Sequence, residues 1–140
     1  MFNNVYADKK VLVTGHTGFK GSWLSFWLLD LGAKVVGFSK DVPTLPSIYE
    51  DTDLASKITD YRGDIRDIDS LKDVILKEKP DFIFHLAAQP IVSESYADPV
   101  GTITTNAIGT MNLLEVLRKV EWSCSVVLIT SDKSYDNVEW

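Results

Sequence analysis

Residues 10–32 read KVLVTGHTGFKGSWLSFWLLDLG and carry a strand, a turn and a helix in succession. The run from Lys10 to Thr14 is short, apolar and rich in valine, which is typical of a buried strand. After the turn, apolar residues recur at the offsets of one helix face, and Gly32 stands where a C-terminal helix cap is expected. Those apolar positions are Trp23, Leu24, Trp27, Leu28 and Leu31. The stretch therefore predicts a first strand and a first helix joined by a glycine-rich turn.

The turn contains three glycines, Gly15, Gly18 and Gly21, in the spacing GxxGxxG. A glycine at the first position permits a tight turn, one at the second lets the backbone approach a pyrophosphate, and one at the third permits close packing of helix and sheet. Phosphates at such a turn meet free backbone amides and the positive end of the helix dipole. A P-loop is excluded, because Lys20 precedes Gly21 instead of following a glycine in the P-loop frame. We interpret the turn as a dinucleotide site; the alternative is a connector that binds no ligand.

The alternation of strands and helices continues along the chain and predicts a parallel sheet. Further strands are expected at 34–38, 58–62, 81–86 and 125–130, and further helices at about 67–79 and 98–120. Residues 39–54 contain two prolines and are expected to form a loop with one helical turn. Right-handed crossovers and the opening glycine turn favour a Rossmann-type, doubly wound α/β sheet in the order 3-2-1-4-5. Because no helix follows the fifth strand, we expect residues 1–140 to be the dinucleotide-binding domain of a longer enzyme, truncated before its substrate domain.

The composition is typical of one globular domain. The chain has 140 residues, 45% of them hydrophobic, and a net charge of −6. An acidic chain without a basic cluster argues against nucleic-acid binding, which depends on neutralising phosphates with Lys and Arg. Cys124 is the single cysteine, which excludes an internal disulfide and a zinc set and favours a small buried apolar role. No apolar stretch approaches the roughly 20 residues of a membrane span, and residues 1–4 do not resemble a secretory signal, so we expect a cytoplasmic protein with no membrane partner and no metal.

The spacing GxxGxxG resembles the extended branch of the short-chain dehydrogenase/reductase superfamily. Three further motifs of that branch follow in order, GDIRD at 63–67, HLAAQ at 85–89 and TNAIGT at 105–110. By this resemblance, the first motif contacts the adenine, the second lies beside the nicotinamide ribose, and the third belongs to a long helix that faces the cofactor. The implied cofactor is NAD. The cofactor-binding residues that the resemblance implies are Gly15, Thr17, Gly18, Phe19, Lys20, Gly21, Ser39, Asp64, Ile65, Leu86, Ala87, Ala88, Gln89 and Thr105.

Three longer segments closely resemble the CDP-glucose 4,6-dehydratases, a subfamily of that branch. They are residues 14–39, 85–99 and 130–140. Related dTDP-glucose dehydratases carry Thr-Asp-Glu where this chain has Ser131, Asp132 and Lys133. The resemblance implies a lyase that converts the nucleotide-sugar CDP-glucose to its 4-keto-6-deoxy derivative by oxidation, loss of water and re-reduction. Such enzymes serve deoxysugar biosynthesis for O-antigen lipopolysaccharide.

The resemblance also implies catalytic roles for the same triplet. Ser131 would hydrogen-bond the sugar hydroxyl that is oxidised, Asp132 would protonate the departing hydroxyl at C6, and Lys133 would be the base at C5. The acid needs a raised pKa and the lysine a lowered one, from burial or from neighbouring charges. Without the resemblance, an adjacent Asp–Lys pair is typical of a solvated turn.

Two features depart from the family pattern. Hydride transfer in this superfamily uses a Tyr-x-x-x-Lys pair after the fifth strand, and the one match here, Tyr6 with Lys10, precedes the first strand. The chain by itself is therefore predicted to be inactive. At the end of the second strand, Ser39 replaces the acidic residue that usually binds the ribose diol of NAD. Ser39 with Lys40 could tolerate a 2′-phosphate, whereas Asp41 would oppose it, so these residues leave NAD and NADP open, and the resemblance favours NAD.

Two other functions fit the sequence. One is another nucleotide-sugar dehydratase or epimerase of the same branch, against which the triplet at 131–133 argues. The other is a dinucleotide-binding module without turnover.

By the resemblance, the parent protein forms a homo-oligomer, a dimer or larger, through the helix at 98–120, so exposed apolar surface is expected there.

Two histidines and three aromatic residues are expected to have structural roles and no role in catalysis or binding. His16 and His85 are interpreted as packing or turn residues. The aromatic residues Trp23, Phe26 and Trp27 repeat at helical spacing and are assigned to the core, not to a base-stacking surface.

Overall fold

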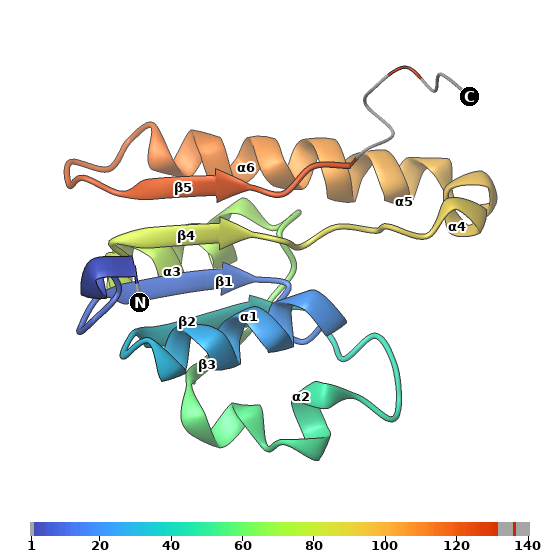
Figure 1. Ribbon diagram of the computed structural model, residues 1–140. Helices are drawn as coiled ribbons and strands as arrows, with labels where there is room; N and C mark the ends of the chain where they lie inside the picture. Colours follow the sequence, from blue (N-terminus) through green and yellow to red (C-terminus); the bar gives the residue numbers. More distant parts are fainter. Residues whose placement is uncertain (1, 132–135, 137–140) are drawn as a thin grey trace.

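A five-stranded parallel sheet with helices on both faces forms the fold (Figure 1). The computed structural model describes residues 2–131 and 136. The strands are β1 (Lys10–Thr14), β2 (Lys34–Ser39), β3 (Thr59–Arg62), β4 (Phe82–His85) and β5 (Ser125–Leu128). Their order is β3-β2-β1-β4-β5, which confirms the predicted topology. The carboxyl ends of all five strands therefore lie at one edge, where ligands bind in open α/β sheets.

Helices from several parts of the chain cover the sheet. They are α1 (Phe19–Asp30), α2 (Ile48–Asp51), α3 (Ile68–Glu78), α4 (Val92–Ala97), α5 (Pro99–Ile103) and α6 (Gly109–Leu117), with the 3-10 turns η1 (Phe2–Asn4) and η2 (Leu54–Lys57) and the π-helical segment η3 (Thr104–Ile108). α1 lies on one face, and α3 and α6 lie together on the other (Figure 1). The helix predicted at 98–120 consists of α5, η3 and α6 in direct succession. Within the described ranges, no helix has both the length and the apolar character of a bilayer span.

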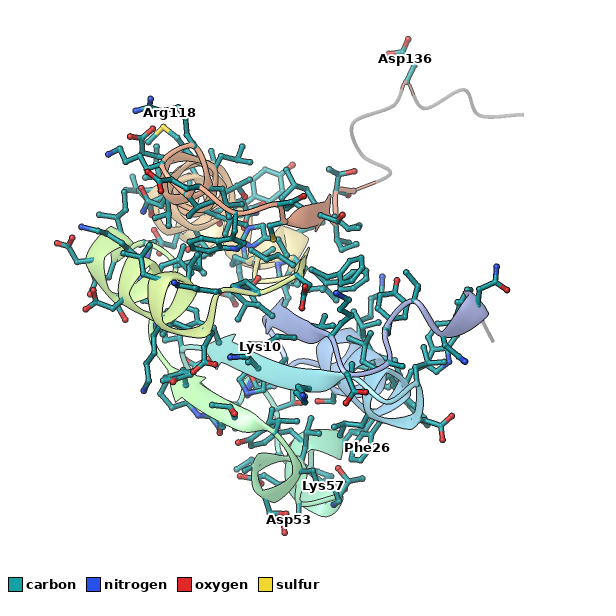
Figure 2. The ribbon with its side chains drawn as sticks, turned by 90° about the vertical axis from the view of Figure 1, so that its left-hand side faces the viewer. Lys10, Phe26, Asp53, Lys57, Arg118 and Asp136 are labelled. Atoms are coloured by element: carbon teal, nitrogen blue, oxygen red, sulfur yellow. The ribbon has the colours of Figure 1, made fainter. Side chains whose placement is uncertain are left out.

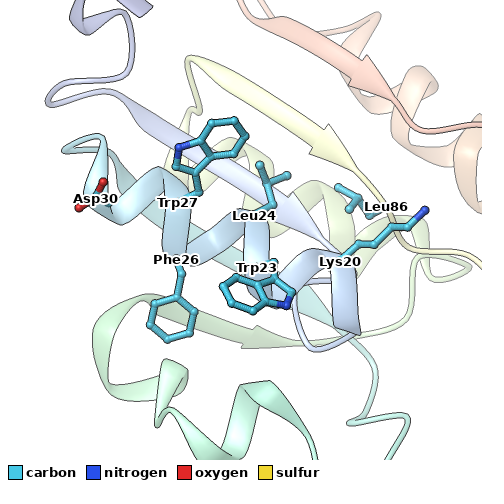
Figure 3. Close-up of a pocket in the computed structure, with 7 residues that line it drawn as sticks. All are labelled: Lys20, Trp23, Leu24, Phe26, Trp27, Asp30 and Leu86. Atoms are coloured by element: carbon cyan, nitrogen blue, oxygen red, sulfur yellow. The ribbon is translucent and has the colours of Figure 1, made fainter. Parts of the chain in front are cut away.

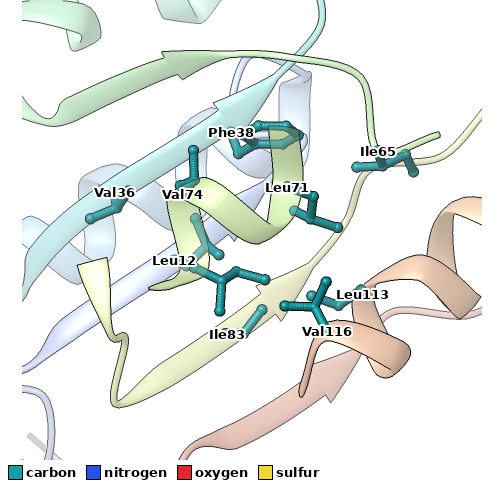
Figure 4. Packing of buried hydrophobic residues seen from close by; sticks show 10 residues of the cluster. Leu12, Val36, Phe38, Ile65, Leu71, Val74, Ile83, Leu113 and Val116 are labelled. Carbon is teal, nitrogen blue, oxygen red and sulfur yellow. The ribbon is translucent and has the colours of Figure 1, made fainter. Parts of the chain in front are cut away.

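The larger core lies between the sheet and the helices α3 and α6 (Figure 4). Its buried side chains are Leu12, Val36, Phe38, Ile65, Leu71, Val74, Ile75, Ile83, Leu113 and Val116. As the sequence predicts, Asp67 caps α3, and its carboxylate accepts hydrogen bonds from the amides of Asp69 (3.1 Å) and Ser70 (3.2 Å). Full burial of one aliphatic side chain contributes about 1.5–3 kcal/mol, so this cluster dominates the stability of the fold.

The helix α1 packs on the sheet through small residues and not through its tryptophans. Its buried residues are Gly21, Ser22, Ser25 and Leu28. Trp23 and Trp27 are 58% and 49% exposed, so their assignment to the core is wrong. Phe26 is half-buried, and the Lys57 ammonium lies 5.6 Å from the centre of its ring (Figure 2). Gly21, Ser22 and Ser25 let the helix approach the sheet closely and Leu28 packs in the core beside them, which leaves the two tryptophans on the outer face.

The part of the sheet formed by β4 and β5 is not covered on both faces. Phe82 and Phe84 are half-buried on the α1 side of β4, where Tyr6 packs against both rings. The side chains of residues 126–129 are 36–47% exposed. The predominantly apolar run at 81–86 predicts a strand covered on both faces, but the structure leaves Phe82 and Phe84 half-buried on one face.

A buried histidine joins β1, β4 and the long helix by a chain of hydrogen bonds. The Ala87 amide donates to Thr14 Oγ1 (3.2 Å), which lies 2.7 Å from His85 Nδ1. His85 Nε2 lies 3.1 Å from Thr110 Oγ1, and that hydroxyl donates to the Asn106 carbonyl (2.8 Å). Because the Thr110 hydroxyl gives its proton to Asn106, it accepts from His85 Nε2, and in the neutral ring Nδ1 then accepts from the Thr14 hydroxyl. Burial disfavours the charged ring and lowers the pKa of His85 to about 4.

We expect the free energy of unfolding to fall between pH 7 and pH 5, in part because the folded state keeps His85 neutral. The unfolded ring takes up a proton near the ordinary histidine pKa of 6.5, whereas the folded ring does so at about 4, so acid favours the unfolded state below pH 6.5. At pH 5 this effect costs about 2 kcal/mol, at 1.36 kcal/mol per pKa unit. Urea unfolding at the two pH values measures the loss. Between pH 7 and pH 5, the free energy of unfolding of His85→Gln should fall by about 2 kcal/mol less than that of the parent chain. An equal fall in both proteins would contradict the assignment of a neutral, buried His85.

Candidate functional site

The glycine turn lies at the carboxyl edge of the sheet, between the end of β1 and the start of α1. Gly15 has a φ of +74°, and a Cβ on it would lie 2.8 Å from the Ala87 nitrogen, so no larger residue fits. A Cβ on Gly21 would overlap the Gly15 carbonyl. The sequence predicts that Gly21 permits close packing against the sheet, and the structure shows that α1 approaches the turn itself.

The start of α1 is open to an anion. Gly18 is the N-terminal cap, and among the described residues no side chain caps this helix. The first amides of a helix have no partner within it, and the helix dipole makes this end positive. A Cβ on Gly18 would meet only the Gly15 carbonyl, at 3.4 Å, so the outer side of the turn has room for a ligand. Phe19 and Lys20 are exposed beside it.

At the end of β2, the hydroxyl of Ser39 points inward. It lies 2.9 Å from His16 Nδ1 and accepts a hydrogen bond from the Thr17 amide (3.4 Å), and the residue is 5% exposed. Thr17 Oγ1 donates to the Asp41 carbonyl (2.6 Å), which ties the turn to the segment after β2. Lys40 and Asp41 are exposed. The charged side chains of Lys40 and Asp41 are therefore accessible at this point of the edge, whereas the Ser39 side chain is buried.

His16 belongs to a polar network that no spacing in the sequence indicates. Its Nε2 donates to Asp60 Oδ1 (2.8 Å), and the Tyr49 hydroxyl donates to Asp60 Oδ2 (2.5 Å). Arg62 donates to the Tyr49 hydroxyl (2.5 Å) and lies over its ring. Burial lowers the pKa of His16 although Asp60 opposes the shift, and burial together with Asp60 raises the pKa of Tyr49 to about 12. The network fastens the turn to β3 and α2, in agreement with a packing role for His16.

After β3, Asp64 and Ile65 lie in different environments. Asp64 pairs with Arg66, with 2.6 Å between Oδ2 and Nη2, and this pairing lowers the pKa of the carboxyl. Ile65 is 5% exposed and packs in the core against Gly109. Of these two predicted cofactor residues, Asp64 is half-buried and paired with Arg66, and the Ile65 side chain is buried in the core.

After β4, residues 86–89 run along the same edge toward the long helix. The Gln89 amide donates to Asn106 Oδ1 (2.7 Å), and Asn106 Nδ2 donates back to the Gln89 carbonyl (2.9 Å). Thr105 precedes Asn106 in η3 and is half-buried, and Ala88 is exposed. The contact of Ala87 with Gly15 brings this segment against the glycine turn. The structure thus gathers the predicted cofactor residues of five separate segments at one edge.

An open apolar groove of about 680 Å³ lies along the outer side of α1 (Figure 3). It is lined by Lys20, Trp23, Leu24, Phe26, Trp27, Asp30 and Leu86. Of the predicted cofactor residues, it includes Lys20 and Leu86 only. The groove therefore lies beside the candidate site and is not identical with it.

Ser131 is the one predicted catalytic residue that the structure describes. It is exposed and follows β5, which pairs in parallel with β4, so it lies at the same edge as the cofactor residues. Asp132 and Lys133 lie outside the described residues. The catalytic roles of all three stay predictions.

Known proteins share the sequence and the fold. Residues 12–139 match the family model of GDP-mannose 4,6 dehydratase. The chain is 50% identical over 137 residues to CDP-glucose 4,6-dehydratase of Salmonella typhimurium, an alignment that covers 98% of this chain and 38% of that protein. UDP-glucose 4-epimerase of Thermus thermophilus, solved in complex with NAD, is 32% identical with a TM-score of 0.68 over 79% of this chain and 34% of that one. UDP-glucose 4-epimerase of Bifidobacterium longum, solved with NAD+ and UDP, is 29% identical with a TM-score of 0.69 over 79% and 33%.

These comparisons confirm the resemblance seen in the motifs, and three of the solved relatives were determined in complex with NAD. The chain spans 31–39% of the length of the first curated relatives that it matches. The family match includes the end of β1, the glycine turn and the segments after β3 and β4, which are the parts that form the edge. The chain therefore belongs to the GDP-mannose 4,6-dehydratase family, a family of nucleotide-sugar dehydratases and epimerases in the extended branch of the short-chain dehydrogenases/reductases.

Proposed function

We propose that this chain is the NAD-binding part of a nucleotide-sugar dehydratase that acts on CDP-glucose. The observation that carries the proposal is the open, uncapped start of α1, which shares one sheet edge with the segments after β2, β3 and β4. The choice of CDP-glucose is supported by the 50% identity to the Salmonella typhimurium dehydratase. The proposed setting is cytoplasmic deoxysugar biosynthesis for O-antigen lipopolysaccharide, without a nucleic-acid or membrane partner.

The residues at the edge fit a dinucleotide laid across the ends of the strands. The amides of Phe19 and Lys20 would hold the pyrophosphate, because the first amides of a helix have no partner within it and lie at the positive end of α1, whereas the Gly18 amide donates to the Gly15 carbonyl (3.1 Å). The other contacts would be Lys40 and Asp41 with the adenosine ribose, Asp64 with the adenine, and residues 87–89 and Thr105 with the nicotinamide ribose. The exposed carboxylate of Asp41 opposes a 2′-phosphate and so favours NAD over NADP. Bound NAD would supply the acceptor and later the donor of the hydride that leaves sugar C4 and returns at C6.

We expect the chain to bind NAD and the variant Gly18→Val to lose about a hundredfold or more in affinity. Valine places two methyl groups where the pyrophosphate approaches, and two charge-assisted hydrogen bonds of about 1.5–3 kcal/mol each are lost. The fold tolerates the substitution, because a Cβ at this position meets no atom closer than 3.4 Å. Calorimetric titration measures the affinity, and urea unfolding verifies the fold. Lys72→Val, on the exposed side of α3, is the control; an unchanged affinity in Gly18→Val would exclude the assigned role.

In the longer protein, the triplet at 131–133 is proposed to act on the sugar. Ser131 would hydrogen-bond the C4 hydroxyl, Asp132 would donate a proton to the leaving hydroxyl at C6, and Lys133 would remove the proton at C5. The exposed position of Ser131 at the carboxyl edge supports this assignment. The Tyr-x-x-x-Lys pair that the family uses to deprotonate the C4 hydroxyl is proposed to belong to another segment of the longer protein.

We expect no dehydratase turnover from the 140-residue chain and conversion of CDP-glucose by the longer protein. General-base catalysis is worth about 10²–10⁴-fold, and the chain has no Tyr-x-x-x-Lys pair after its fifth strand to provide it. In the longer protein, Lys133→Ala should lower product formation by a similar factor while C4 oxidation persists. Chromatography of the 4-keto-6-deoxy product and the absorbance of reduced nicotinamide separate the two steps, and Lys119→Ala, an exposed lysine after α6, is the control. Turnover of GDP-mannose or UDP-glucose in place of CDP-glucose would contradict the proposed substrate.

We also propose that the longer protein associates through the long helix. Apolar residues recur every three or four positions along α5, η3 and α6 and form an exposed stripe. The stripe consists of Val100, Ile103, Ala107, Met111 and Leu114. Its four larger side chains are 46–70% exposed, and exposed patches of this kind mark interaction sites.

The substitution Ile103→Glu should convert a dimer of the longer protein to monomers. Each charge would be buried opposite an apolar surface, which costs more than the association can offset. Sedimentation equilibrium measures the mass. Lys72→Glu on the exposed side of α3 is the control, and a mass that Ile103→Glu leaves unchanged would place the interface elsewhere.

A further inference from the structure

Two asparagine side chains of the long helix, Asn106 and Asn112, hold the two backbone segments between which a dinucleotide would extend. We propose that α5, η3 and α6 set the distance between the adenine and nicotinamide ends of the cofactor site through these two amides. The proposal rests on the proposed NAD site and adds two positioning residues to it.

Asn112 holds the segment after β3. Its residue is 6% exposed, and its Nδ2 donates to the carbonyls of Ile65 (3.1 Å) and Arg66 (3.0 Å). The helix also approaches this segment closely, since a Cβ on Gly109 would lie 2.5 Å from Ile65 Cδ1. Because Asp64 precedes these carbonyls directly, Asn112 controls where the adenine end of the edge lies relative to α6.

Asn106 holds the segment after β4. Its side-chain amide exchanges two hydrogen bonds with the backbone of Gln89, as donor and as acceptor, in the way that one strand pairs with another. The Gln89 side chain in turn donates to Thr102 Oγ1 (2.9 Å) and accepts from the Ile91 amide (2.6 Å). The nicotinamide end of the edge is therefore tied to η3 and α5.

The helix between the two asparagines is itself fixed to the sheet. Leu113 and Val116 are buried in the larger core, and Thr110 joins His85 to the Asn106 carbonyl. Asn106 lies in the π-helical segment, a rare local widening of a helix that is frequently found at functional sites. Because both side-chain amides belong to one helix that is fixed to the sheet, they hold the segments after β3 and β4 at defined positions relative to each other.

Both asparagine side chains bond to the backbone of the segments that they hold. Asn106 uses both its oxygen and its nitrogen on Gln89, and Asn112 directs its nitrogen to two carbonyls beneath the surface. Their proposed effect on a ligand passes through this backbone. Variants at the two positions should therefore affect different halves of a dinucleotide.

Calorimetric titration of the chain with ADP and with NAD tests this division, because ADP reaches only the adenine and pyrophosphate positions. In Asn106→Ala, the affinity for NAD should fall about tenfold, the equivalent of one to two net hydrogen bonds, while the affinity for ADP stays unchanged. In Asn112→Ala, both affinities should fall by the same factor. Thr102→Val is the control, because it removes a partner of the Gln89 side chain and leaves the backbone pair intact.

Urea unfolding identifies variants that fail to fold. Should Asn112→Ala be one of them, Asn112→Leu, which fills the same space without a donor, carries the same expectation. Folded Asn106 variants with an unchanged ratio of NAD to ADP affinity would overturn the inference while leaving the NAD site in place. A parent chain that binds neither ADP nor NAD would overturn the proposed function, and the inference with it.

Discussion

The close convergence of β1, β4 and α1 on the glycine turn is the constraint on which the rest of the structure depends. The Gly15 amide donates to the Phe38 carbonyl at the end of β2 (2.9 Å), and its Cα has the Ala87 backbone as a neighbour on the other side. No side chain fits at this point, so the backbone itself forms the junction of three strands. Because the junction is so tight, α1 starts directly above the strand ends and directs its amides to the edge.

Polar side chains from distant parts of the chain hold every backbone segment that surrounds this junction. His16 and Asp60 fix the turn to β3, and His85 fixes the end of β4 to the long helix. Asn112 and Asn106 fix the segments after β3 and β4. Each of these groups is paired, and a buried polar group left without a partner costs about 1–3 kcal/mol, so these bonds specify one arrangement of the loops. A cofactor site needs this kind of support, because a ligand benefits from groups that are already in position.

Apolar side chains stay exposed on both faces of the sheet. The stripe on the long helix lies on one face of the sheet, and the groove along α1 and the α1 side of β4 lie on the other. A chain of this composition has enough apolar residues to fill two cores, yet it leaves Trp23, Trp27 and Ile103 at the surface. Such patches are typical of contact surfaces with further polypeptide. The match to 31–39% of the length of longer relatives is consistent with this role.

The sequence by itself determined the five strands, their order and the position of the turn. Period-two and period-3.6 patterns are local, and the spacing of Gly15, Gly18 and Gly21 reports a local backbone geometry, so each can be recognised within one segment. The same is true of the Asp67 cap, which acts on amides two and three residues away. The motifs also identified the segments that meet at the edge, and the family comparison confirmed the resemblance.

Only the tertiary structure decided which side of α1 is buried and which polar groups support the edge. Apolar spacing assigns Trp23 and Trp27 to the core, but the approach of α1 to the sheet requires small side chains, and Gly21, Ser22 and Ser25 carry no apolar signal. The pairing of His16 with Asp60 joins residues 44 positions apart, and that of Asn112 with Ile65 joins residues 47 apart. Such contacts form when crossover connections bring distant segments together, and no local pattern records them.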